Sequence, residues 1–176
     1  MVTRQFDYRP VRLALASVLL ATVASLVDAR TGAPPLSHSA QLAALDRIAV
    51  LELDAIDREA LLAEDEAATA DSSAKPLRFA LPVDLQLTLA DAGTWEPAPD
   101  GGWVWRLRIH APNATELNFG FTRYRLATGA TLHIWSEDYD YVEGPYGAAD
   151  ESHAGDLWTP VVPGERVVLE LYEPAG

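Results

Sequence analysis

The sequence predicts a mainly β protein, an antiparallel β-sandwich or jelly-roll-like domain preceded by a short helical segment. Three observations carry this prediction. Apolar and polar residues alternate in several short stretches of the second half, most clearly at residues 103–110. Turn dipeptides, such as those at 100–101 and 163–164, separate these stretches. Between residues 45 and 63, apolar residues instead recur at spacings of three and four, as in an amphipathic helix.

Residues 1–29 are expected to be a secretory signal peptide. Three arginines lie among the first twelve residues, an uncharged run follows over residues 13–27, and small residues at Val27 and Ala29 favour cleavage after Ala29. The run is shorter than the roughly 20 residues that a membrane-spanning helix needs. We therefore expect export to the periplasm or the exterior, with no stable membrane insertion after cleavage. An uncleaved anchor is the alternative.

The next segments are expected to lack strands. Residues 30–40 are rich in proline, glycine and serine, which predicts a flexible mature N-terminus with His38 in solvent. Residues 41–75 are expected to be a helical segment and a linker, with the clearest helix beginning at Asp54, a suitable N-terminal cap. For residues 48–53, IAVLEL, a short strand is the alternative.

The β-sandwich domain is expected over residues 76–174. Its first stretch, 77–89, alternates weakly and contains a proline, which favours an edge strand or a break between two strands. Residues 103–110 and 117–126 are expected to be two paired central strands. Further strands are expected at 131–135, at 157–162 and at 165–172.

The strand at residues 103–110 is expected to be half-buried. Two tryptophans, Leu107 and Ile109 fall on one face, and Arg106 and Arg108 fall on the other, which we expect to face solvent. The five tryptophans of the chain provide ample core material, so the domain should fold without metal or disulfide.

Composition excludes several functions. The formal net charge of −13 disfavours binding to nucleic acid or to anionic membranes, which needs clustered basic residues. There is no cysteine, so thiol chemistry and cysteine-based metal sites are excluded. The four histidines (His38, His110, His133 and His153) lie near no recognisable nucleophile motif. We therefore predict no catalytic residue and no cofactor, and hence a protein that is not an enzyme by itself.

The acidic stretch WSEDYDYVEG contains the weak calcium candidates Glu137, Asp138 and Asp140. Their spacing matches no EF-hand loop, and acidic loops are usually solvated hairpin tips. The prediction is therefore that this stretch is a hairpin tip and that the protein holds no metal.

Two groups of residues are candidates for contact with a partner. Four arginines on the two expected central strands form a basic group in an acidic chain, and two aromatic residues of later segments suit stacking on a partner or a sugar. Because the last two arginines continue the phase of the inward row, a bulge near Thr122 or a change of facing is required. The candidates are Arg106, Arg108, Arg123, Arg125, Tyr146 and Trp158.

Several short stretches, taken in order, resemble a known family. They are LLAEDEA, KPLRFALPV, GTWE, DGGWVWRLRI, LNFGFTRYRL, GATLHIW, VEGPYGAAD and GDLWTPVVPGERVVLELYEP. Together they are similar to the amino-terminal propeptide region of secreted bacterial trypsin-like serine endopeptidases of the lysyl endopeptidase type, over about residues 50–174. In that family the region lies between the signal peptide and the protease domain. This sequence does not contain the protease domain, so no catalytic residue carries over; a truncated precursor, a split gene and a stand-alone domain are the alternatives.

The resemblance implies a secreted, non-catalytic prodomain. Such a domain would assist the folding of a cognate serine endopeptidase, inhibit it, or do both, in cis or in trans. Its acidic surface would steer it to a basic partner. The alternative function is a secreted carbohydrate- or surface-binding module, suggested by the aromatic residues.

Overall fold

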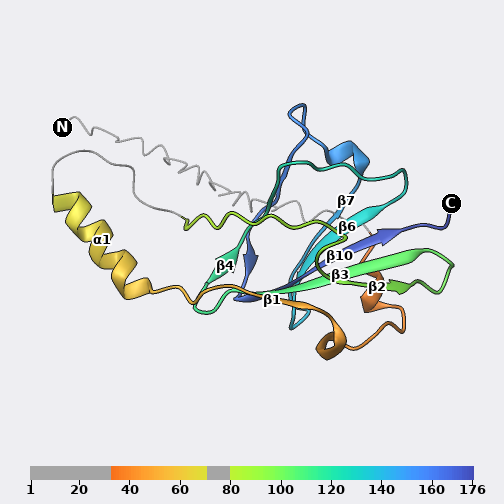
Figure 1. The fold of residues 1–176 in the computed structure, drawn as a ribbon, viewed down its shortest axis with the longest axis horizontal. Coiled ribbons are helices and arrows are strands. Elements are labelled where there is room, and N and C mark those ends of the chain that lie inside the picture. Colours follow the sequence, from red (N-terminus) through yellow and green to blue (C-terminus); the bar gives the residue numbers. More distant parts are fainter. Residues whose placement is uncertain (1–32, 71–79) are drawn as a thin grey trace, which may run out of the picture.

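The computed structural model describes residues 33–70 and 80–176 and shows a mainly β protein (Figure 1). Within these ranges, six strands form one mixed sheet, in which β1, β3, β10, β6 and β7 are successive neighbours and β2 also pairs with β3. Two smaller sheets have two strands each, β4 with β9 and β5 with β8. The predicted mainly β class is confirmed, although two facing layers of a sandwich are not established.

The elements follow each other along the chain in short segments. The strands are β1 (Val50–Glu52), β2 (Thr94–Pro97), β3 (Trp103–His110), β4 (Glu116–Leu117), β5 (Gly120–Phe121), β6 (Thr131–Ser136), β7 (Val142–Tyr146), β8 (Leu157–Trp158), β9 (Val162–Pro163) and β10 (Arg166–Glu173). The α-helix is α1 (Arg58–Ala70), and the 3-10 helices are η1 (Leu36–His38), η2 (Leu45–Arg47) and η3 (Ala148–Asp150). Most of the expected strands are therefore present, with shifted ends.

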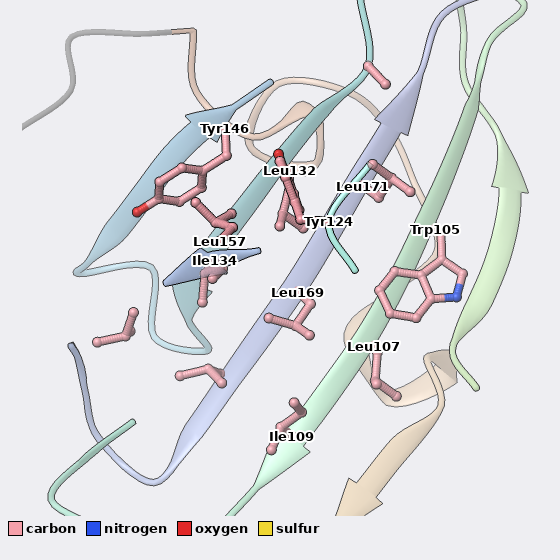
Figure 2. Close-up of a cluster of buried hydrophobic side chains, with 13 residues drawn as sticks. Trp105, Leu107, Ile109, Tyr124, Leu132, Ile134, Tyr146, Leu157, Leu169 and Leu171 are labelled. Atoms are coloured by element: carbon pink, nitrogen blue, oxygen red, sulfur yellow. The ribbon is translucent and has the colours of Figure 1, made fainter. Parts of the chain in front are cut away.

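One face of the six-stranded sheet carries the apolar core. Figure 2 shows side chains of β3, β10 and β6 on this face, packed with Tyr124, Tyr146 and Leu157. The core residues of these three strands are Trp105, Leu107, Ile109, Leu132, Ile134, Val167, Leu169 and Leu171. Burial of each large apolar side chain contributes about 1.5–3 kcal/mol, so this cluster is a main source of stability.

The tryptophans do not all belong to the core, as the sequence led us to expect. Trp105 and Trp135 are buried, but Trp95 and Trp103 are substantially exposed and Trp158 is 66% exposed. The indole of Trp95 donates a hydrogen bond to the backbone oxygen of Leu89, so its polar edge is satisfied while part of its ring faces solvent. The expectation that these five side chains form one core is therefore wrong for three of them.

The pairing expected for the two central strands is also wrong. Instead of pairing with residues 117–126, β3 pairs antiparallel with β10 and with β2, and parallel with β1. The stretch expected as one strand contains only β4 and β5, which pair with β9 and β8. The chain turns directly after Phe121, so Arg123 and Arg125 lie on no strand and no bulge is needed.

The second face of the sheet is covered by residues 33–49, which lie against it in an irregular path with two short 3-10 helices (Figure 1). The expectation that this side of residues 103–110 faces solvent is therefore wrong, since Val104 and Arg106 are buried. Residues 33–40, expected to be flexible, instead make hydrogen bonds to β6 and β10. Because this segment lacks an apolar period, its role as a cover was not visible in the sequence.

The helical segment begins later than expected. Residues 50–52 form the parallel strand β1, so the strand alternative for IAVLEL is the one observed. The helix α1 follows, and the Asp57 carboxylate caps it by accepting the N–H of Ala60 at 3.0 Å. Figure 1 shows α1 extending away from the sheet. No helix within residues 33–70 or 80–176 is long and apolar enough to cross a membrane.

The stretch expected as an edge strand is not a strand in the part that the structure describes. Residues 80–88 have no regular secondary structure, a turn follows at residues 89–91, and residues 80–89 are exposed and pair with no neighbouring strand there. The rest of the expected strand, residues 77–79, lies outside the described residues. Among the described residues, the first sheet strand after α1 is therefore β2, which forms a hairpin with β3 through the turn at residues 98–102.

Candidate functional site

The face covered by residues 33–49, which we call the covered face, concentrates buried and half-buried ionisable groups. They come from four neighbouring strands, β2, β3, β10 and β6, and their side chains point toward the covering segment rather than toward the core. The groups are Glu96, Arg106, Arg108, His133 and Glu170. Buried charges persist only where they are paired and hydrogen bonded, so each of these groups must have partners.

Arg106 and Glu96 form an ion pair on adjacent strands. Nε of Arg106 donates to Oε1 of Glu96 at 2.9 Å, and a terminal nitrogen of the guanidinium contacts the same oxygen. The guanidinium also donates to the backbone oxygen of Ala43 at 2.7 Å, while the second oxygen of Glu96 accepts the N–H of Ala43 at 2.8 Å. Since Arg106 is only 2% exposed, it fastens the covering segment to the sheet and presents no surface to a partner.

Glu170 lies at the centre of the covered face. The register places it between Arg106 on β3 and His133 on β6. One carboxylate oxygen accepts the backbone N–H of Ser37 at 3.1 Å, and the other accepts the Ser37 hydroxyl. The signal in the sequence was a carboxylate inside the apolar run VVLEL, which must find donors once the strand is buried on both faces.

Two histidines adjoin this carboxylate. Nε2 of His133 lies 2.9 Å from the backbone oxygen of Ala33, so this nitrogen carries a proton, because a carbonyl only accepts. Burial lowers the pKa of His133, an effect that the Ala33 carbonyl and the Glu170 charge partly oppose and nearby His38 reinforces. Burial also lowers the pKa of His38, against the opposing charge of Glu170. Both rings therefore favour the neutral form at neutral pH.

The expected hairpin tip after β6 is occupied by internal contacts. Both carboxylate oxygens of Glu137 bond to the guanidinium of Arg108, at 2.7 and 3.2 Å, and this pairing raises the pKa of Arg108. Asp138 accepts the Ser136 hydroxyl and the N–H of Asp140, and the first of these lowers its pKa most. In the ranges that the structure describes, no three potential ligands gather for a metal ion. The carboxylates of Glu137 and Asp138 are thus engaged by protein donors, while Asp140 is exposed and contributes its backbone N–H.

His110 lies between two carboxylates. Its Nδ1 is 2.6 Å from Glu52 on β1, and its Nε2 is 3.5 Å from Glu165 just before β10. The backbone N–H of Asn113 donates to Glu165 at 3.0 Å and lowers the pKa of this carboxyl most. An imidazole flanked by two acids links β1 to the residue before β10 but is not the nucleophile–base pair that hydrolysis needs.

The last candidates lie apart from the covered face. Tyr146 is buried in the core, where its hydroxyl donates to Glu143 at 3.1 Å. Arg123 and Arg125 are exposed, and Arg125 lies 3.9 Å from Glu151. Trp158 stands on the rim of a pocket of about 460 Å³ between the η3 loop and β8. The structure therefore does not bring the six predicted partner-binding residues together, and of the six it leaves these two arginines and Trp158 on the surface.

Comparison with known protein families shows which family the chain belongs to. A protein-family model described as the lysyl endopeptidase N-terminal domain matches residues 52–176, which is most of the chain. This chain belongs to the lysyl endopeptidase N-terminal domain family. No solved structure matches it.

Membership of the lysyl endopeptidase N-terminal domain family confirms the resemblance found in the sequence. The matched residues include all strands from β2 to β10 and thus the whole apolar core. The covering segment, residues 33–49, precedes the match. The family domain and its cover therefore meet along the covered face, through Ser37 and Ala43 on one side and Glu170, Arg106 and Glu96 on the other.

Proposed function

We propose that this chain is the secreted propeptide-like domain of a lysyl endopeptidase-type precursor, and that it assists the folding of a cognate serine endopeptidase domain, inhibits it, or does both. The single observation that carries the proposal is the family match over residues 52–176. An N-terminal domain of a protease precursor has no need of catalytic groups of its own. The contacts around His110, two carboxylates and no nucleophile motif, agree with a non-catalytic domain.

The fold supports this function because a folding assistant must itself hold a defined shape. The apolar core of the sheet and the ion pairs of the covered face fix the relative positions of its strands, and the chain has no cysteine for a disulfide. A rigid surface can stabilise a folding transition state of a partner by binding it more tightly than the unfolded chain. The same surface, bound over the partner's active site, would inhibit it.

The formal net charge of −13 supports a basic partner surface. Such charge complementarity raises association rates most at low ionic strength. The proposal includes export by a signal peptide cleaved after Ala29, which lies outside the described residues. It applies whether the protease domain is joined in cis or supplied in trans.

The experiment is refolding of the separately produced cognate protease domain in dilute salt, with and without this domain. We expect the domain to raise the yield of active protease and to inhibit the folded protease at micromolar concentration. A matched control is the same domain carrying Leu169→Asp, which places a charge in the core and should remove both effects by unfolding it. Unchanged yield together with no inhibition would refute the proposal.

A further inference from the structure

The pocket beside Trp158 combines an exposed aromatic ring with carboxylates. It has a volume of about 460 Å³, and its lining includes Tyr146, Asp150, Asp156, Leu157 and Trp158. Leu157 points into the core, as Figure 2 shows, so the pocket rests on a fixed floor. The site is separate from the covered face, and its residues have no role in the contacts described there.

The ring of Trp158 is held in place although 66% of the residue is exposed. Its indole N–H donates to a carboxylate oxygen of Asp156 at 3.2 Å. The ring lies against the backbone of Gly120 on the paired strand β5, where an added Cβ would come within 2.6 Å of ring carbons. An exposed but immobilised tryptophan loses little conformational entropy on binding, which is the property of a contact residue.

The carboxylate of Asp156 is also fixed. One of its oxygens accepts the Ser152 hydroxyl, and the other accepts the indole N–H of Trp158. Asp150 supplies a second carboxylate to the lining, and one of its oxygens accepts the backbone N–H of Gly147 at 2.8 Å. A carboxylate offers about four acceptor positions, so its two bonds orient Asp156 and leave acceptor capacity toward the pocket.

We propose that this pocket binds a lysine or arginine side chain of a protein partner. A cation is attracted by the face of an indole ring and by adjacent carboxylates, and the two attractions act together here. A neutral sugar ring would also stack on Trp158, but the carboxylate of Asp156 beside the ring favours a cation over a neutral ligand. The pocket is large enough for the aliphatic stem of either basic side chain, which would lie along the exposed ring of Trp158.

This proposal goes beyond the proposed function and does not depend on it. It names the chemical group that the pocket recognises, whichever protein carries that group. Its test therefore uses short peptides and no protease, so that failure of one proposal leaves the other intact.

The test is a titration of the ¹⁵N-labelled domain, with the indole N–H signal of Trp158 as the readout. The probes are the blocked tripeptide Gly-Lys-Gly, its arginine counterpart, its norleucine counterpart and a neutral glucan hexasaccharide. The variant Trp158→Phe identifies the signal by its loss. We expect the basic peptides to bind with a Kd on the order of millimolar, as single exposed cation–aromatic and ion-pair contacts allow. We expect no saturable shift with norleucine.

Variants test the roles of the two groups. Asp156→Asn should weaken lysine-peptide binding several-fold and reduce its salt dependence. Trp158→Ala should abolish binding. Because this variant lacks the indole signal, its binding is followed by the line widths of the peptide's own NMR signals. The matched control is Asp140→Asn, which removes the same charge from an exposed turn outside the pocket and should leave binding unchanged. Equal shifts with lysine and norleucine, no saturable shift with either basic peptide, or binding of the hexasaccharide alone would each overturn the proposal.

Discussion

The carboxylate of Glu170, in the central strand β10, accepts both the backbone N–H and the hydroxyl of Ser37. The two residues are 133 positions apart in the chain, so this contact closes the covering segment onto the last strand. Glu170 is 1% exposed and carries its charge into the interior. The donors of Ser37 therefore replace the water that this carboxylate would otherwise bind.

The first prediction concerns Ser37→Ala. It removes one of two donors to a buried carboxylate and should lower the free energy of unfolding by about 1–3 kcal/mol, measured by urea titration. The control is Ser39→Ala, whose hydroxyl makes only an exposed 3.4 Å contact with the backbone oxygen of Leu36. A loss for Ser37→Ala no larger than that of the control would show that the contact with Glu170 is not stabilising.

A second prediction compares the two arginine pairs. Glu96→Ala leaves the guanidinium of Arg106 buried without its carboxylate partner and should lower the free energy of unfolding by about 3–5 kcal/mol. Glu137→Ala should cost less, because Arg108 and Glu137 both retain 17% side-chain exposure and water can compensate. Urea unfolding measures both. The double variant Glu96→Leu with Arg106→Met should recover much of the loss, whereas a double variant no more stable than Glu96→Ala would contradict the ion-pair account.

A third prediction concerns pH. Burial holds the pKa of His133 in the folded domain below its ordinary value of 6.5, so the unfolded chain binds protons more readily. The contribution of the neutral ring to stability is therefore complete above pH 6.5 and is lost as the pH falls from 6.5 toward the folded pKa. His38 acts in the same direction. Glu170, the charged neighbour of both rings, opposes this loss but does not reverse it.

The measurement is the free energy of unfolding between pH 7.5 and pH 5. We expect it to decrease below pH 6.5 in the unaltered domain and to decrease less in His133→Gln, whose amide can still donate to the Ala33 carbonyl. The control His153→Gln changes an exposed loop residue and should leave the slope unchanged. The lowered pKa values of Asp100, Asp138 and Glu165 act only at lower pH. Identical slopes for His133→Gln and the unaltered domain would contradict this prediction.

A fourth prediction separates backbone strain from packing at two glycines with positive φ. Gly93 has a φ of +83°, and an added Cβ would lie 2.3 Å from the buried ring of Trp105. Gly164 has a φ of +99°, with no atom near an added Cβ. Gly164→Ala should therefore cost about 1–2 kcal/mol of conformational energy, and Gly93→Ala should cost this plus about 1–3 kcal/mol for overpacking. An equal decrease in melting temperature for the two variants would show that the ring of Trp105 moves aside without an energetic cost and would contradict the prediction.

Strand positions were predictable from the sequence because alternation and turn dipeptides are local signals. Residues 103–110 alternate, and Leu107 and Ile109 do point into the core. Long-range strand pairing was not predictable, because β10, which pairs with β3, lies some sixty positions away, and the parallel strand β1 shares the other edge of β3 with β2. The sequence predicts one long strand in place of the short strands β4 and β5, because the apolar alternation continues across the break at residues 118–119.

The covered face was missed for a different physical reason. A strand that alternates between apolar residues and arginine usually has one side in water, and Arg106 fits that pattern. Its side is instead closed by a segment whose contacts are mainly backbone groups, such as the carbonyls of Ala33 and Ala43. Nearly every residue carries the same backbone donor and acceptor, so contacts through these groups leave no pattern of residue types in the sequence. Of the two aromatic contact candidates, Trp158 lies on the surface and Tyr146 lies in the core, because a tyrosine suits core and rim alike.

The most direct test of the central claim is the yield of active protease secreted from a gene for the complete cognate precursor, compared with the same gene lacking the codons for residues 30–176. A third strain supplies the deleted domain in trans, with its own signal peptide. The proposed function predicts that deletion abolishes most of the secreted activity without lowering the amount of protease polypeptide made, and that the separate domain restores it. Equal specific activity of the protease secreted with and without the domain would contradict the account.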